Sequence, residues 1–345
     1  MKRAKSIKTS RVKMADIAAL ANVSISTVSR ALVDSPDIAD DLKDKIRGIA
    51  DAHGYVVNQA ARSLRSQSTR TIGLILPMGH ETGQQISDPF LLEFIGCLAE
   101  EVISRRYDIL LSKVPEPEPN WLGNLVQSHR FDGLLVIGQS DQHAAINALA
   151  SKYEPLVVWG ERMKDQAYCS VGVDNVMGGR MAAEHVIEAG SRDPLFLGPK
   201  HVPEVDARQR GFLDALANAN INPKADPFVE THFTYESAYE VASDLIRSKR
   251  KFDGLVCASD VIAYAAMKAL EDAGIAVPDQ VNVCGFDDVS LARTLTPPLT
   301  TIRQDLKMGA RFMVSLLFDR MEGKKSSSAV IPASLIIRRS TRPIG

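Results

Sequence analysis

The stretch MADIAALANVSISTVSRAL, residues 14–32, has the spacing of two short helices joined by a tight turn. We expect helices over 14–21 and 26–32, and their inward face carries small or apolar residues, namely Ile17, Ala18, Ala21, Val23 and Val28. Ser24 is placed to cap the second helix by accepting a hydrogen bond from the backbone N–H of Ser26 or Thr27. A third helix over about 40–52, stopped by Gly54, completes a small all-α domain. The pattern predicts a helix-turn-helix.

The second helix of this motif carries mostly polar side chains on its outward side. Ile25, Ser26, Ser29 and Arg30 lie there, and such residues read base edges in a major groove through hydrogen bonds and methyl contacts. Two-helix corners are common in proteins, so a corner without a DNA-binding role is the alternative at this point.

The charges of the chain are unevenly distributed. Its 345 residues have a net charge of −1, but residues 1–70 hold 13 Lys and Arg against 7 Asp and Glu, and the remainder holds 28 against 35. A basic N-terminal segment favours a nucleic-acid partner for that segment alone. The four cysteines are scattered, with no pair at metal or disulfide spacing, and neither a signal-peptide core nor a bilayer-length apolar run occurs. We expect a cytoplasmic protein with no membrane partner.

From Thr71 onward, β-branched runs such as TIGLILP, DGLLVIG and PLVVWG alternate with helical stretches, which is typical of α/β folds with parallel sheets. Residues 130–137, RFDGLLVI, are echoed by residues 251–258, KFDGLVCA. We interpret the echo as two similar lobes. The alternative is that a basic residue before FDGL recurs because a tight helix-to-strand turn favours it.

These patterns divide the chain into three parts. Residues 1–57 form the helix-turn-helix domain, 58–70 a hinge helix or linker, and 71–345 a two-lobed body, for which the family resemblance given below implies ligand binding and dimerisation. Enzyme motifs such as GxGxxG, GxxxxGK, GxSxG and HExxH are missing from the sequence, and the seven histidines are dispersed. We therefore expect no enzyme activity, no catalytic residues, no cofactor and no metal site.

Polar residues that follow the expected strands are candidates for ligand binding, because ligands bind at the carboxyl ends of parallel strands. They are Asp174, Ser259, Asp260 and Asp287, joined by Arg208 on a helix. Carboxylates and a guanidinium suit sugar hydroxyls. Each has a plainer alternative: an aspartate after a strand often caps the next helix, and Arg208 could be a surface charge.

Read in order, VSISTVSRAL (residues 23–32), ARSLRS (61–66) and the two-lobed body resemble the lactose/galactose repressor (LacI/GalR) family along the whole chain. The resemblance implies a periplasmic-binding-protein-like body and a repressor of carbohydrate-use genes that binds a palindromic operator as a homodimer. It implies base contacts for Ile25, Ser26 and Arg30, and contacts to phosphate or base edges for Thr27 and Ser29. Tyr55 and Asn58 would approach the DNA backbone and the hinge, and Leu64 would wedge into the minor groove.

The resemblance also bears on the ligand. It implies that Asp174, Arg208 and Asp287 bind the effector, that Phe233 covers it and that Phe90 lies near the cleft mouth. Ser259 stands where sugar-responsive relatives often have asparagine, so a nucleobase or a phosphorylated sugar stays open beside a sugar. No C-terminal heptad segment of the kind that tetrameric relatives carry follows the last strand, so we expect a dimer. The alternative function is a cytosolic sugar-binding protein without sequence-specific DNA binding.

Two departures from the family pattern concern the helix-turn-helix domain. Asn22 stands where many relatives have glycine in the turn, and asparagine is the next best residue for a left-handed backbone. Ala39 replaces the serine that opens the third helix, which loses a cap, although Asp40 and Asp41 still favour the helix dipole. We expect both the turn and the helix to form.

Overall fold

The computed structural model describes residues 12–32, 34–55, 68–79, 83–115, 117–223 and 225–344. Contacts divide the chain into two compact units, residues 1–69 and residues 70–345. The described part of the first unit is helical, and the second is an α/β body. The expected fold class, an all-α helix-turn-helix followed by a two-lobed body with parallel sheets, is confirmed.

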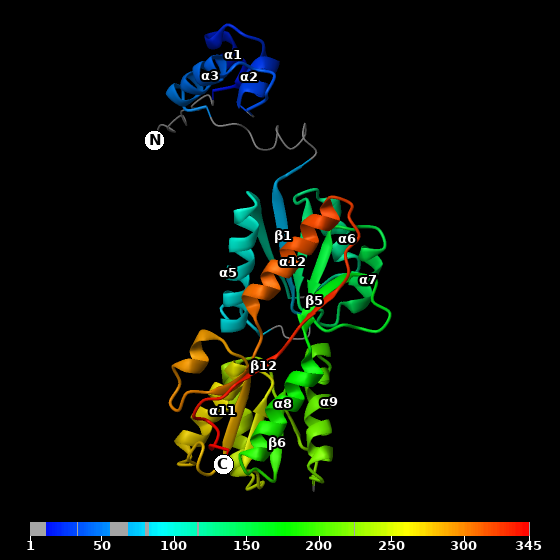
Figure 1. The fold of residues 1–345 in the computed structure, drawn as a ribbon, viewed down its shortest axis with the longest axis vertical. Coiled ribbons are helices and arrows are strands. Elements are labelled where there is room, and N and C mark those ends of the chain that lie inside the picture. The colour runs from blue at the N-terminus through cyan, green and yellow to red at the C-terminus, as the bar shows by residue number, and fades with distance from the viewer. Residues whose placement is uncertain are drawn as a thin grey trace, which may run out of the picture. The chain divides into compact units, whose positions relative to one another are not determined.

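The helical unit consists of α1 (Met14–Ala21), α2 (Ile25–Leu32) and α3 (Asp40–Ala52), drawn in blue in Figure 1. Its core is formed by side chains of all three helices, among them the fully buried Ile17, Val28 and Ile46. The predicted second helix begins one residue earlier than expected, at Ile25.

The turn between α1 and α2 forms as expected. Asn22 adopts a left-handed backbone, with φ 58° and ψ 46°, and its N–H donates to carbonyl groups at the end of α1. The hydroxyl of Ser24 accepts from the backbone N–H of Thr27 at 3.1 Å, which confirms the predicted cap. Ala39 gives α3 no side-chain cap, and Asp40 and Asp41 occupy its first turn.

The first lobe of the body is built on a six-stranded parallel sheet. Its strands lie in the order β11 (Ala329–Ile331), β5 (Cys169–Val173), β4 (Leu156–Trp159), β3 (Gly133–Ile137), β1 (Thr71–Pro77) and β2 (Asp108–Val114). Its helices are α5 (Pro89–Ser104), α6 (Trp121–Gln127), α7 (His143–Ala150) and α12 (Leu306–Met321). Alternate strand residues enter two separate apolar clusters, one with α5 and α12 and one with α6 and α7, because side chains alternate between the faces of a sheet.

The second lobe has a sheet with the order β12 (Ser334–Ile336), β10 (Thr300–Arg303), β9 (Asn282–Asp287), β8 (Gly254–Cys257), β6 (Pro194–Gly198) and β7 (Phe228–Glu230). Only β12 runs antiparallel to its neighbour among these paired strands. The helices are α8 (Asn175–Glu188), α9 (Pro203–Asn218), α10 (Tyr235–Arg247) and α11 (Asp260–Asp272), with a short 3-10 helix, η1 (Ser290–Arg293).

The repeated FDGL segments lie at the same place in the two lobes. They lead into β3 and β8, and each strand is fourth from the same end of a sheet with the same strand order. The predicted lobe duplication is confirmed. The aspartate of each repeat also holds a turn: Asp132 accepts from the backbone N–H of Arg70, and Asp253 accepts from those of Arg192 and Asp193. The turn and the duplication therefore explain the echo together.

The chain passes between the lobes three times, from β5 into α8, from β10 into α12 and from β11 into β12. Figure 1 shows these segments at the waist of the body. The crossings from β5 into α8 and from β10 into α12 therefore place polar residues, such as Asn175 and Gln304, between the lobes. Within the described residues, no helix combines the length and apolar character needed to cross a bilayer.

Candidate functional site

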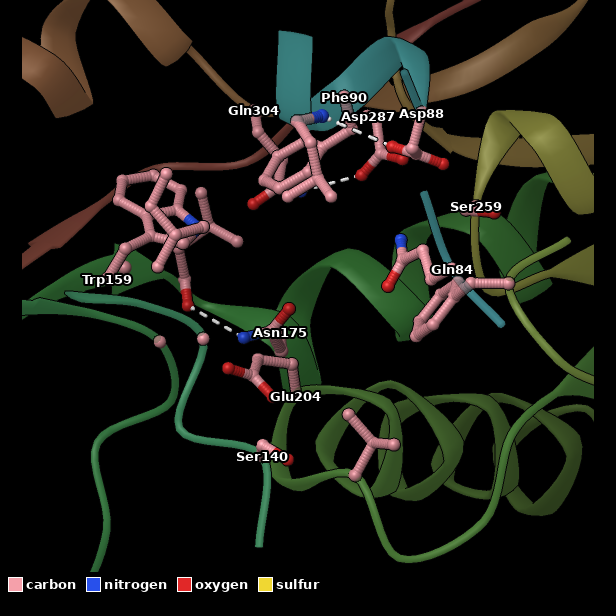
Figure 2. A pocket seen from close by; sticks show the side chains of 18 of the residues that line it. Gln84, Asp88, Phe90, Ser140, Trp159, Asn175, Glu204, Ser259, Asp287 and Gln304 are labelled. Atoms are coloured by element: carbon pink, nitrogen blue, oxygen red, sulfur yellow. Dashed lines mark hydrogen bonds between the residues drawn. The ribbon is translucent and has the colours of Figure 1, made fainter. Parts of the chain in front are cut away.

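A pocket opens between the two lobes of the body. It encloses about 810 Å³ of space free of protein atoms, including its open mouth. Figure 2 shows Asp287, Asp88 and Gln304 on one side of the space and Asn175 and Glu204 on another. Five of the seven residues expected to bind an effector line the pocket, namely Phe90, Arg208, Phe233, Ser259 and Asp287.

Arg208 is the buried cation of this pocket. Its Nε donates to Asn175 Oδ1 at 2.9 Å, its Nη1 donates to the carbonyl oxygen of Ala258 at 2.5 Å, and its guanidinium lies 3.6 Å from the centre of the Phe286 ring. Burial lowers the pKa of Arg208, and the negative charge of Asp287 opposes that change. The alternative that Arg208 is a surface charge is wrong, because the residue is buried.

Asp287 ends β9 with a φ of 121°, a backbone conformation that residues with a side chain rarely adopt. Its Oδ1 accepts from Gln304 Nε2 at 2.7 Å, and Gln304 lies at one of the crossings between the lobes. Burial raises the pKa of Asp287 to about 7, against the lowering effects of Arg208 and Gln304. A carboxyl group that is held in a strained backbone conformation and has a raised pKa is typical of a functional site.

The wall from the first lobe is largely apolar and aromatic. Trp159, at the end of β4, packs its ring 4.5 Å from that of Phe94, centre to centre. Gly309 of α12 makes room for the indole, since a Cβ atom there would come within 2.5 Å of it. Further apolar contributions to this wall come from Pro77, Met78, Phe90, Leu91 and Ile137.

Asp174 and Asp260 do not line the pocket. Asp174 is exposed and its carboxylate accepts from the backbone N–H of Met177 at 2.9 Å, so the helix-cap alternative describes it. Asp260 is buried and accepts from the backbone N–H of Val289 and the hydroxyl of Thr301. Burial raises the pKa of Asp260 well above its ordinary value, and Asp287 adds to the rise. Both aspartates serve the local structure beside the pocket.

Sequence reasoning missed several lining residues, including Asn175, Gln304, Glu204 and Asp88. Gln304 follows β10, so the rule that found Asp287 could have found it. Asn175 adjoins Asp174. The same turn points the Asp174 side chain back to α8, which it caps, and the Asn175 side chain into the pocket. Glu204 lies in the first turn of α9, and no sequence pattern distinguishes it from a residue that favours the helix dipole.

The second expected site is the outward side of α2. Ile25 is 46% exposed, Ser26 and Arg30 are exposed, and Thr27 and Ser29 are half-buried. The Ser24 hydroxyl bonds to the hydroxyls of Ser26 and Thr27, at 2.7 and 2.8 Å, and so orients the start of this side.

The remaining residues expected to contact DNA lie near the end of the helical unit. Tyr55 is half-buried and packs against the core of that unit. Asn58 and Leu64 lie outside the described residues, as does most of the expected hinge 58–70. Three or more His, Cys, Asp or Glu side chains in a metal-binding arrangement do not occur in the part of the chain that the structure describes.

Comparisons with known proteins match both parts of the chain. Residues 13–58 match the model of bacterial regulatory proteins of the lacI family, and residues 183–341 match a periplasmic binding protein-like domain. The chain is 30% identical over 341 residues to the HTH-type transcriptional repressor PurR of Mannheimia succiniciproducens, covering 95% of this chain and 98% of the relative.

Two solved structures share the fold. The transcriptional regulator CelR in complex with cellobiose is 25% identical, with a TM-score of 0.69 over 96% of this chain and 100% of CelR. The lac repressor dimer bound to operator is 22% identical, with a TM-score of 0.83 over 96% of this chain and 99% of that one. A helical unit followed by an α/β body of this fold is thus a known combination.

Proposed function

The chain belongs to the lacI family of bacterial regulatory proteins and is a ligand-responsive DNA-binding transcriptional regulator, and we propose that it represses carbohydrate-use genes under the control of a sugar-like effector in the pocket between its lobes. The observation that carries the choice of ligand is the pocket itself, with a buried Arg208 and Asp287 facing an aromatic wall. We place this regulator in the cytoplasm, where its operator DNA is, and we assign it no catalytic role.

The DNA-binding part of the proposal assigns base contacts to Ile25, Ser26 and Arg30, and contacts near phosphate or base edges to Thr27 and Ser29. Support comes from α2, which presents these side chains outward while Val28 and Ala31 face the core. Tyr55, Asn58 and the wedge residue Leu64 complete the assignment. The division into residues 1–57, 58–70 and 71–345 is part of the same proposal.

The effector is an uncharged polyhydroxylated molecule in this proposal. Three carboxyl groups, those of Asp88, Glu204 and Asp287, line the pocket together with one guanidinium, so the lining offers more acceptors for ligand hydroxyl groups than cations for an anionic ligand. Amide and carboxyl oxygens accept from hydroxyl groups, and Trp159 offers a flat apolar surface. The complex of CelR with cellobiose supports a sugar. A phosphorylated sugar would find one cationic side chain, Arg208, among the described residues that line the pocket, and its guanidinium already donates to Asn175 and Ala258.

We place the repressor on its operator as a homodimer, because two helix-turn-helix units related by a two-fold axis match the two halves of a palindrome. The body offers apolar side chains for a second copy to cover. On α5, Leu92 is 52% and Ile103 is 63% exposed, and on α12 Met308 and Phe312 are exposed as well.

The test is a selection of bound sequences from a random DNA duplex pool by the full-length protein, at a stated salt concentration, with and without a panel of sugars. We expect a palindrome whose recovery changes with one neutral sugar. Failure to enrich any sequence, while a sugar still binds, would instead support a sugar-binding protein without sequence-specific DNA binding.

A further inference from the structure

An amide oxygen without a partner lies at the boundary between the lobes. Gln139, which follows β3 in the first lobe, is fully buried. Its Nε2 donates to the Tyr168 hydroxyl at 2.9 Å and to the backbone carbonyl oxygen of Glu161. Its Oε1 is buried and accepts no hydrogen bond. A buried acceptor without a hydrogen bond lowers the stability of the fold, so we expect a donor to bond to this oxygen.

The orientation of the Gln139 amide follows from its partners. A flipped amide would place Oε1 against the carbonyl oxygen of Glu161, and two acceptors would then face each other. The NH₂ group therefore points to Glu161, and the oxygen points to the other side. Whatever satisfies that oxygen must carry a proton.

Glu204 reaches the same place from the second lobe. A Cβ atom on Gly160 would lie 2.4 Å from Gln139 Oε1 and 2.8 Å from Glu204 Oε1, so both oxygens converge on the bare face of this glycine. The backbone N–H of Gln139 also interacts with the Glu204 carboxyl and acts to lower its pKa, which links the two lobes at this place. Figure 2 shows Glu204 beside Asn175 at this edge of the pocket.

We propose that Glu204 is a positioning residue that joins the two lobes as a neutral carboxylic acid, with its O–H donated to Gln139 Oε1. The bond supplies the donor that the buried oxygen lacks and adds to the interaction of the carboxyl with the Gln139 backbone N–H. It fixes the spacing of the lobes on the side of the pocket next to Asn175, where Glu161 of the first lobe accepts from Asn175 Nδ2 at 2.8 Å.

The groups that face Glu204 act in both directions. Burial raises the pKa of the Glu204 carboxyl, and Glu161, which follows β4, raises it further. Arg208, one turn along α9, and the two backbone N–H groups oppose this rise, while Tyr168 of the first lobe also interacts with the carboxyl. The net direction is upward, which agrees with a proton held on the acid.

The sign of the pH dependence follows. A carboxyl group with a raised pKa in the folded protein keeps the bridge at low pH and loses it as the pH rises through that pKa. Loss of the bridge at higher pH would then weaken the contact between the two lobes. A consequence for the effector response rests on the proposed function, but the bridge itself does not.

The direct test is the difference infrared spectrum between the wild-type protein and E204Q, using the full chain without DNA or ligand. At about pH 6, where an ordinary glutamic acid is ionised, we expect the wild type to show a protonated-carboxyl band that E204Q lacks. A difference spectrum with carboxylate bands alone would overturn the proposal. Because Asp287 and Asp260 are present in both proteins, their bands cancel.

A second test separates the hydrogen bond from simple packing. E204Q keeps a donor for Gln139 Oε1, whereas E204M fills a similar volume without one. We expect E204M to lower the melting temperature by about 2–4 °C. E204Q should stay nearer the wild type and lose only the part of the pH dependence that Glu204 contributes. Equal melting temperatures for the two variants at every pH would contradict a donated bond.

A double-mutant cycle tests the partner. If Glu204 and Gln139 are bonded, the melting-temperature losses of E204M and Q139M add to more than the loss in the double variant. Additive losses would show that the two residues act independently and would overturn the bridge. None of these measurements involves DNA or an effector, so failure of the proposed regulatory function would leave their outcome unaffected.

Discussion

The two lobes of the body have the same strand order and opposite pocket chemistry. The first lobe gives the pocket an apolar and aromatic wall around Trp159, Phe90 and Ile137, while the second gives it Arg208 and Asp287. The strands that set the topology are buried in both lobes. The residues that set the chemistry stand at strand ends, as Trp159 and Asp287 do, or on the helices α5 and α9, as Phe90 and Arg208 do, so that a substitution leaves the sheet intact.

This difference shows how a duplicated fold can bind an amphipathic ligand. A sugar ring has apolar faces and polar edges, and a pocket with one aromatic and one charged wall offers a partner to each. The effector would therefore sense the distance between the lobes. We propose that a ligand in the body alters the affinity of the helix-turn-helix units for DNA by changing that distance.

The largest effect is expected for R208A, which removes the cation of the polar wall. The variant loses two buried hydrogen bonds and leaves Asp287 without its counter-charge, which typically costs about 3–5 kcal/mol of stability. We expect the effector response to be lost while operator binding is retained, as measured by DNA titration with and without effector. The exposed Arg210, two residues along α9, gives the control R210A. A response that persists in R208A would remove Arg208 from the pocket's function.

The next effect concerns the aromatic wall. W159L should weaken effector binding by about tenfold, the usual worth of an aromatic contact, without changing operator affinity. The matched control is W121L on α6, because Trp121 donates to Gln142 Oε1 and does not line the pocket. Equal effector affinities of W159L and the wild type, measured by calorimetry, would show that the first lobe does not contribute a binding wall.

A smaller effect is expected from pH. Asp287 has a pKa of about 7 in the folded protein and an ordinary value near 3.8 otherwise, so its contribution to stability is full below the ordinary pKa and is lost as the pH rises to about 7. D287N removes this contribution. Melting temperatures of the two proteins between about pH 4 and pH 8 should differ by an amount that changes up to about pH 7 and then stays constant. A constant difference throughout would contradict the raised pKa.

The smallest effect concerns the duplicated FDGL turns. D253A removes the acceptor for two backbone N–H groups and should cost about 2 kcal/mol, whereas D132A should cost about 1 kcal/mol. Urea unfolding of both variants measures the two losses, with the effector response as a further readout. If either variant changed the response more than it changed stability, these turns would have a part in signalling as well as in the fold.

The sequence was sufficient to predict the fold because periodicity and turns determine it. The expected helices of the helix-turn-helix, the Ser24 cap and the strands from Thr71 onward all form, since each depends on local spacing. The FDGL echo also predicted the duplication, because both copies hold the same turn.

The pocket could be predicted only in part. The strand-end rule placed Ser259 and Asp287 in the lining, yet it also selected Asp174, whose carboxylate turns back onto its own helix. Which of two neighbouring polar residues faces a pocket depends on the backbone direction after the strand. The position of Glu204 against Gln139 depends on how the lobes approach each other, and no local pattern carries that information.

The central claim is that the pocket recognises an uncharged polyhydroxylated ligand and that this ligand controls operator binding. The most direct measurement is the operator affinity of the full-length protein in the presence of matched sets of ligands, each set holding a neutral sugar, its uronic acid and its phosphate ester, at fixed salt. We expect one neutral sugar to change the affinity by about 5–150-fold, with its two anionic relatives inactive and the change absent in R208A. A response to the anionic members alone would contradict the account.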